Sequence, residues 1–185
     1  MIEGHSIEWG KVEDILGISD IVVAHNASFD RAFLEKNIDF KNVWACSKND
    51  VNWKERGFFN TKLELLSIWH GFYYDSHRAM NDVNATIHLL LHPSYKDFPP
   101  LEELVGNSQK THQLIINKFP YNESFIKMLK KRGGYRYNSS DRSWRILIKD
   151  SDVLDQEIDW LKKNIYNGYF QGEIKEISLY NKYKV

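Results

Sequence analysis

The chain has 185 residues, of which 42% are hydrophobic and 14% aromatic, and its 25 Lys and Arg balance 25 Asp and Glu. This composition fits one globular domain with a small appendage and excludes a largely disordered chain. The sequence contains no run of about eighteen apolar residues, and its first residues lack the basic and apolar start of a secretory signal. We therefore expect a soluble cytoplasmic protein. The single cysteine, Cys46, excludes an internal disulfide and a thiolate zinc cage.

The neutral total charge is an average over two unlike parts. Residues 1–105 carry 10 Lys and Arg against 16 Asp and Glu, a net charge of −6, whereas residues 106–185 carry 15 against 9, a net charge of +6. Such asymmetry is typical of an acidic catalytic part joined to a part that contacts polyanions. Solvated helix faces and loops of different charge explain it equally well, so the asymmetry needs a second signal.

The first part alternates short apolar runs with amphipathic stretches. The run Ile21–Ala24 is apolar and rich in β-branched residues, as in a strand buried on both faces, and a polar turn follows it. Alternation of this kind favours an α/β layered fold. The expected elements are a helix over 7–16, a strand over 20–24, a helix over 29–37, a strand over 42–47, and helices over 61–70 and 78–91.

The second part predicts a small α+β unit. Pro99 and Pro100, followed by a polar stretch, interrupt the pattern, so we predict a linker at 106–111 between a first domain, 1–105, and a C-terminal unit, 112–185. Two β-prone runs flank Asn138-Ser-Ser-Asp141 and indicate a hairpin. The expected elements are a strand over 113–118, a helix over 123–132, the hairpin, a helix over 152–165 and a strand over 173–180.

Two carboxylates and a histidine occupy positions suited to chemistry. Asp30 follows a predicted buried strand at the start of a helix, where open α/β sheets commonly place ligand sites, and Asp82 lies in the first turns of another helix. Carboxylates on different elements suit Mg²⁺ or Mn²⁺, and His77, five residues before Asp82, suits the deprotonation of an attacking water. Taken singly, each Asp is equally typical of a helix cap or dipole partner.

The combined pattern resembles a known family. Ile21-Val-Val-Ala-His-Asn-Ala-Ser-Phe-Asp30 resembles the second motif of the DnaQ-like, DEDDh-type 3′–5′ exonucleases, and His77-Arg-Ala-Met-Asn-Asp-Val83 resembles the third. The segments between them and the tail, including Gly134-Tyr-Arg-Tyr and Trp144, resemble bacterial members related to the DNA polymerase III epsilon subunit. The resemblance spans essentially the whole chain.

The resemblance implies a ribonuclease-H-like fold that hydrolyses phosphodiesters from 3′ ends with two Mg²⁺ or Mn²⁺ ions. Its implied ligand is single-stranded nucleic acid or a 3′ end, DNA before RNA, and its implied protein partners are a polymerase or a second copy. The residues carried over by position are Asp30 and Asp82 as metal ligands, His77 as general base, and His25, Asn26 and Phe29 near the substrate. For His25 and Asn26, a structural role in the turn is the alternative.

One departure concerns the first motif of the family. That motif is an Asp-x-Glu on a strand upstream of the second motif, and no Asp-x-Glu precedes Asp30 here. We therefore expect an exonuclease domain that is truncated at its N-terminus, lacks half of its metal ligands, and is weakly active or inactive. The alternative is a non-catalytic nucleic-acid-binding or interaction module on the same scaffold.

The basic tail offers a possible single-strand platform. Arg136, Arg142 and Arg145 interleave with Tyr135, Tyr137 and Trp144 around the predicted hairpin, and basic side chains beside aromatic ones suit phosphates and stacked bases. In the alternative, the aromatic side chains pack the core of the unit itself.

Overall fold

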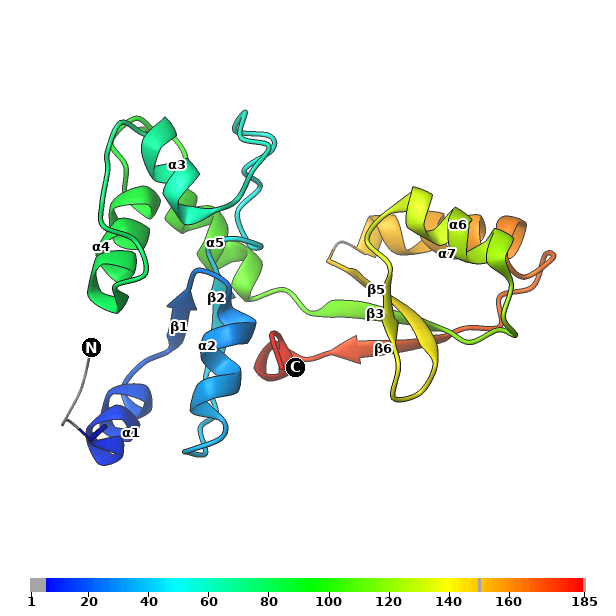
Figure 1. The fold of residues 1–185 in the computed structure, drawn as a ribbon, viewed down its shortest axis with the longest axis horizontal. Helices are drawn as coiled ribbons and strands as arrows, with labels where there is room; N and C mark the ends of the chain where they lie inside the picture. Colours follow the sequence, from blue (N-terminus) through cyan, green and yellow to red (C-terminus); the bar gives the residue numbers. More distant parts are fainter. Residues whose placement is uncertain (1–5, 150, 185) are drawn as a thin grey trace. The chain divides into compact units, whose positions relative to one another are not determined.

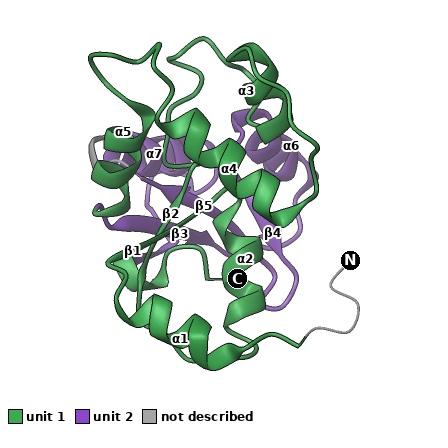
Figure 2. Ribbon diagram, turned by 90° about the vertical axis from the view of Figure 1, so that its left-hand side faces the viewer, with its two compact units in different colours: residues 1–109, 179–185 green, residues 110–178 purple. Residues whose placement is uncertain are grey.

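The structure is a computed structural model that describes residues 6–149 and 151–184. Within them, seven α-helices, one short 3-10 helix and two sheets confirm the mixed α/β class. The chain divides into two units, coloured separately in Figure 2: unit 1 runs to Gln109 and resumes at Leu179, and unit 2 spans Lys110–Ser178. None of the helices in the described part has the length and apolar character needed to cross a membrane.

Unit 1 surrounds a short parallel pair of strands with helices (Figure 1). The β-branched run forms the first of these strands, and its partner is buried along its whole length. The first strand itself is only partly buried and Val23 is exposed, which corrects the expectation that it is buried on both faces. The elements are α1 (Trp9–Gly17), β1 (Ile21–Ala24), α2 (Ala27–Leu34), β2 (Val43–Cys46), α3 (Leu63–Trp69), α4 (Ala79–Leu90), α5 (Pro100–Ser108) and the 3-10 helix η1 (Leu179–Asn181).

The parallel register brings the ends of β1 and β2 to the same edge. Ile21 pairs with Val43 and Ala24 pairs with Cys46. The residues that follow the two strands therefore emerge side by side, and the amide of Ser47 donates a hydrogen bond to the Ala24 carbonyl at 3.0 Å. This edge positions the candidate site.

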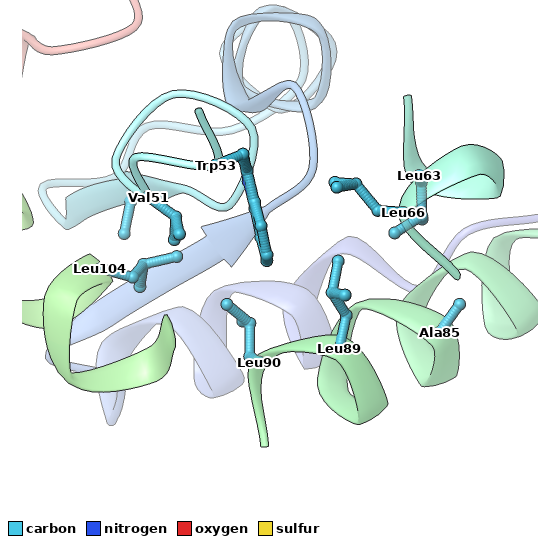
Figure 3. Close-up of a cluster of buried hydrophobic side chains, with 9 residues drawn as sticks. Val51, Trp53, Leu63, Leu66, Ala85, Leu89, Leu90 and Leu104 are labelled. Atoms are coloured by element: carbon cyan, nitrogen blue, oxygen red, sulfur yellow. The ribbon is translucent and has the colours of Figure 1, made fainter. Parts of the chain in front are cut away.

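The main core of unit 1 gathers around Trp53 (Figure 3). Leu63 and Leu66 reach it from α3, and Leu89 and Leu90 reach it from α4. The indole Nε1 of Trp53 donates to the Ser47 carbonyl at 2.7 Å, so this buried polar atom is satisfied. The core thus ties the segment after β2 to helices α3 and α4.

Helix α4 has two apolar stripes, and only one is buried. Ala85, Leu89 and Leu90 face the core. The sequence predicts one apolar face made of Met80, Val83, Ile87, Leu90 and Leu91. Of these only Leu90 is buried, because the 3.6-residue period accommodates either stripe and packing selects between them. The exposed stripe consists of Met80, Val83, Ile87 and Leu91.

The predicted linker is partly helical, which corrects the prediction for residues 106–111. Helix α5 continues to Ser108, with Pro100 in its first turn, where proline is favoured, and with Leu104 fully buried. Only residues 109–111 separate α5 from the first strand of unit 2. Burial of one helix face outweighed the polar composition of the stretch.

The end of the chain belongs to unit 1, which corrects the prediction that 112–185 form one C-terminal unit. Arg31 on α2 is only 1% exposed, and its guanidinium donates to the carbonyls of Tyr180 and Lys182 at 2.7 and 2.6 Å. The buried Nζ of Lys182 donates to the carbonyls of Asn107 and Ser108, at the negative end of the α5 dipole. Unit 2 is therefore an insertion within unit 1.

Unit 2 has a β-α-β-β-α-β order. Its four strands lie in the order β4-β5-β3-β6 with every neighbouring pair antiparallel, which is the split β-α-β, or ferredoxin-like, arrangement. Both helices lie on one face of this sheet (Figure 1). The elements are β3 (His112–Asn117), α6 (Glu123–Arg132), β4 (Arg136–Asn138), β5 (Ser143–Ile148), α7 (Ser151–Asn164) and β6 (Glu173–Ile177).

The expected hairpin is confirmed as the β4–β5 pair. Gly133 and Gly134 end α6 with positive φ angles of 85° and 77°. A Cβ on Gly134 would lie 3.1 Å from the Ile146 side chain, so glycine serves both the left-handed backbone and the close approach of β5.

Candidate functional site

His25 is the first residue after β1, and both of its ring nitrogens are occupied. Nε2 lies 2.8 Å from the Thr61 carbonyl and Nδ1 lies 2.8 Å from the Ser47 hydroxyl. A carbonyl only accepts hydrogen bonds, so Nε2 carries the proton and Nδ1 accepts from the hydroxyl. His25 therefore joins β1, the end of β2 and the segment before α3.

The surroundings of His25 favour its neutral form. Burial lowers the pKa of His25, while the hydrogen bond to Thr61 and the charge of Asp82 oppose this effect and Lys48 adds to it. A neutral imidazole with both nitrogens engaged holds the turn in place. The predicted structural role of His25 in the turn agrees with these hydrogen bonds.

Asn26, Phe29 and Asp30 lie in the turn and in the first turn of α2. Asn26 has φ 81° and ψ 50°, a left-handed conformation that asparagine tolerates better than most residues, and its side chain makes no capping hydrogen bond. Phe29 is 73% exposed, and the Asp30 side chain is exposed as well. Partial desolvation raises the pKa of Asp30, and a main-chain hydrogen bond opposes that shift.

Asp82 lies close to a partly buried tyrosine. The Tyr74 ring packs against the main core, and its hydroxyl is near enough to the Asp82 carboxylate to interact with its charge. Burial, the proximity of the Asp82 carboxylate and the charge of Glu64 raise the pKa of Tyr74, so the hydroxyl keeps its proton. Tyr74 thus borders Asp82 on the core side.

His77 lies just before α4 in a left-handed conformation, with φ 62° and a side chain that is 90% exposed. Its Nε2 is 3.6 Å from Oε1 of Glu64, on the first turn of α3, and the Ser76 hydroxyl donates to the same carboxylate oxygen. At 3.6 Å this contact is longer than a hydrogen bond, so it places the exposed imidazole beside the Glu64 carboxylate without fixing its tautomer.

Five residues therefore form one polar cluster, here called the Asp82 cluster. Its members are linked by electrostatic interaction of Asp82 with His25 and with Tyr74, of Glu64 with Tyr74, and by the 3.6 Å approach of His77 to Glu64. Sequence reasoning missed two members, because tertiary packing of α3 and of the loop before α4 brings them in. The members are His25, Glu64, Tyr74, His77 and Asp82.

Asp30 stands apart from this cluster. No hydrogen bond or ion pair between described residues links Asp30 to His77 or Asp82. Hard divalent ions prefer several carboxylate oxygens, yet within residues 6–149 and 151–184 no three His, Cys, Asp or Glu side chains are arranged to hold a metal ion. Asp30 and Asp82 as placed do not build a two-metal centre.

Comparison of the chain with protein-family models, curated proteins and solved structures found no match.

Proposed function

We propose that unit 1 is an exonuclease-type module of ribonuclease-H-like fold that acts on the 3′ ends of nucleic acid, single-stranded DNA before RNA. The observation that carries the proposal is the Asp82 cluster. It joins His25 of the motif that follows β1 to His77 and Asp82 of the motif that opens α4. Residues 31–76 separate these motifs in sequence, and the electrostatic interaction of His25 with Asp82 supports their proximity near the end of β1.

The roles within the cluster follow from its contacts. His77 is the exposed member, and its imidazole is the group that accepts a proton from an attacking water. Glu64 lies beside this imidazole, Tyr74 borders the Asp82 carboxylate, and His25 holds the turn. Substrate approaches from the side where Phe29 and Asp30 are exposed.

Hydrolysis needs carboxylates that the described residues do not assemble. Within the described residues, β1 pairs with β2 alone, so its other edge has unpaired main-chain groups that a further strand would satisfy. We expect the chain by itself to hydrolyse weakly. A strand bearing an Asp-x-Glu pair and docked on that edge would add two carboxylates to unit 1.

The test is a nuclease assay on the purified chain. A 5′-labelled single-stranded DNA and an RNA of the same sequence are incubated with Mg²⁺ or Mn²⁺, and products are resolved by length. The expected result is slow shortening from the 3′ end, faster on DNA, that drops by at least about tenfold in Asp82→Asn and in His77→Asn. The matched control is Asp75→Asn, an exposed carboxylate whose ion-pair contact, with Arg78, is at 3.8 Å.

Two other outcomes have defined meanings. Binding of the labelled strand without any shortening, even after fusion of an upstream Asp-x-Glu strand, favours the non-catalytic binding module, because the metal set is the missing part. Absence of both shortening and binding at low salt overturns the proposal.

A further inference from the structure

The hairpin of unit 2 separates its basic side chains from its aromatic ones. Successive residues of a strand point to opposite faces of the sheet. Tyr135 and Trp144 pack against the core of unit 2, with the Tyr135 hydroxyl 2.7 Å from the buried carboxylate of Glu157. Tyr137 pairs with Trp144 across the strands, with ring centroids 5.4 Å apart. The interleaved sequence therefore does not place its aromatic rings beside its arginines.

The arginines lie on the opposite, helix-free face. Arg136 and Arg145 are direct cross-strand partners in β4 and β5. Like charges in this position destabilise a sheet, so the pair costs stability in the absence of an anion. Arg145 is anchored, because it donates to Asp141 at 2.7 Å and to the Ser143 hydroxyl at 2.9 Å. Arg136 is exposed, and its guanidinium makes no side-chain hydrogen bond or ion pair with any other described residue.

Two further cations extend this surface, here called the hairpin patch. Lys118, just beyond β3, has its Nζ 3.7 Å from the Asp141 carboxylate, and Arg142 is exposed in the turn between the two strands. Hydrogen bonds from Ser143 and Arg145 lower the pKa of Asp141 to about 2, so Asp141 contributes one negative charge at neutral pH. The patch consists of Lys118, Arg136, Arg142, Arg145 and Asp141 and carries a net charge of +3.

The nearest other carboxylate on this face is already neutralised. Glu173 on β6 pairs with Ile116, which in turn pairs with Arg145, so β3 separates the two charged residues. Lys175 lies 3.1 Å from Glu173 and balances its charge. The excess positive charge of the hairpin patch is therefore left for an external anion.

We propose that the hairpin patch is a binding site for the phosphodiester backbone of a nucleic-acid strand, and that it holds the strand by charge without stacking its bases. The inference rests on the proposed function, in which nucleic acid is the ligand, and it names the surface that retains it. An anchored guanidinium beside a free one suits the oxygens of successive phosphates. Because the described residues of β4 and β5 on this face include no Phe, Tyr or Trp, affinity should depend on salt and hardly on base identity.

The test measures binding of the full 185-residue chain to fluorescein-labelled oligo-dT and oligo-dA of 20 nucleotides by anisotropy, without divalent ions. Arg136→Glu is expected to weaken binding about tenfold at low salt. Lys163→Glu, with the same change of charge on the exposed side of α7, is the matched control and should weaken binding less than about threefold. Arg136→Ala should reduce the slope of log Kd against log salt by about 0.7.

The outcomes separate this inference from its alternatives. Equal losses of affinity in Arg136→Glu and Lys163→Glu would overturn it, because binding would then depend on the total charge of the protein and not on a particular site. A loss of affinity of about tenfold or more in Tyr137→Ala would overturn binding by charge alone in favour of base stacking. An affinity about tenfold higher for one of the two oligonucleotides than for the other would do the same. Circular dichroism of each variant establishes that it is folded.

The same variants distinguish this inference from the proposed function. Nuclease activity that depends on Asp82, together with unaltered binding in Arg136→Glu, would reject the hairpin patch alone. Loss of binding in Arg136→Glu, together with no Asp82-dependent shortening, would retain the patch and reject the catalytic proposal.

Discussion

The two units place their charged and apolar side chains differently. Unit 1 buries charges, namely Arg31, Asp50 and Lys182, and exposes large apolar side chains such as Phe29 and Met80. Unit 2 has a four-stranded sheet with both helices on one face, and its buried charge is Glu157, which pairs with Arg132 at 2.8 Å. Its exposed cations include Arg136 and Arg142.

The difference indicates how each unit reaches stability. Unit 2 has enough strands to form an independent layer, whereas a two-stranded sheet depends on what packs around it. In unit 1 the returning segment at residues 179–184 supplies part of that packing, through Arg31 and through Tyr183 against β2. Exposed apolar surface on α2 and α4 is typical of a region that contacts another molecule.

Removal of the buried Arg31 guanidinium tests whether buried charge stabilises unit 1. Arg31→Met should destabilise unit 1 by about 2–3 kcal/mol, because two main-chain carbonyls lose charge-assisted hydrogen bonds and the rings of Phe40 and Trp44 lose a cation. Peptide-resolved hydrogen exchange should show lost protection at β2 and at residues 179–184, with unit 2 unchanged.

The control for this change is Arg78→Met, which removes an exposed arginine 3.8 Å from Asp75 and should alter stability by less than about 0.5 kcal/mol. If Arg31→Met left the protection of residues 179–184 intact, the returning segment would be held by packing alone, and the two units would differ less than the buried charges indicate.

The sequence predicted local elements well and their long-range partners poorly. Apolar periodicity and turn residues located β1, β2, α6 and the hairpin to within a few residues, because these signals are local. The burial of Lys182 is not local: it requires carbonyls of α5 that lie more than seventy residues away. No lysine near a chain end carries a sequence signal for that environment.

The candidate site shows the same limit. The motif residues His25, His77 and Asp82 were predicted from position and resemblance, and electrostatic interactions link them through Glu64 and Tyr74. Glu64 and Tyr74 were missed because an acidic residue in a first helical turn and a tyrosine in a loop between helices are common in any fold. On the hairpin the residue types were predicted, whereas the strand alternation decides which of them share a face.

The stability of unit 1 should also depend on pH, because two of its histidines are partly buried. Burial lowers the pKa of His25 and of His70 in unit 1, and the charges of His92, His88 and Arg56 lower that of His70 further, against the opposing Leu66 carbonyl. A depressed folded-state pKa gives stability that is present above the unfolded value of 6.5 and is lost as pH falls below it.

Unit 1 should therefore weaken from pH 7 to pH 5, by at most about 1.4 kcal/mol per pH unit for each histidine. His70→Phe should flatten this dependence, because it keeps a ring beside Trp53, Phe58 and Tyr95 but removes the proton. His77→Gln, at an exposed position, is the control and should leave the slope unchanged. Urea unfolding at several pH values measures the slope, and an equal slope in wild type and His70→Phe would contradict the assignment.

Two substitutions of Asn26 distinguish a role in shaping the turn from a role in binding nucleic acid. Its left-handed backbone predicts that Asn26→Ala loses about 1 kcal/mol of stability, whereas Asn26→Gly changes it by less than about 0.5 kcal/mol, since glycine adopts this conformation without strain. Urea unfolding measures both, and oligonucleotide anisotropy supplies the second readout. If Asn26→Gly keeps both stability and binding, the side chain only shapes the turn between β1 and α2. If Asn26→Gly keeps stability but loses binding, the Asn26 amide contacts the strand, and unit 1 then recognises nucleic acid directly instead of relying on the hairpin patch of unit 2.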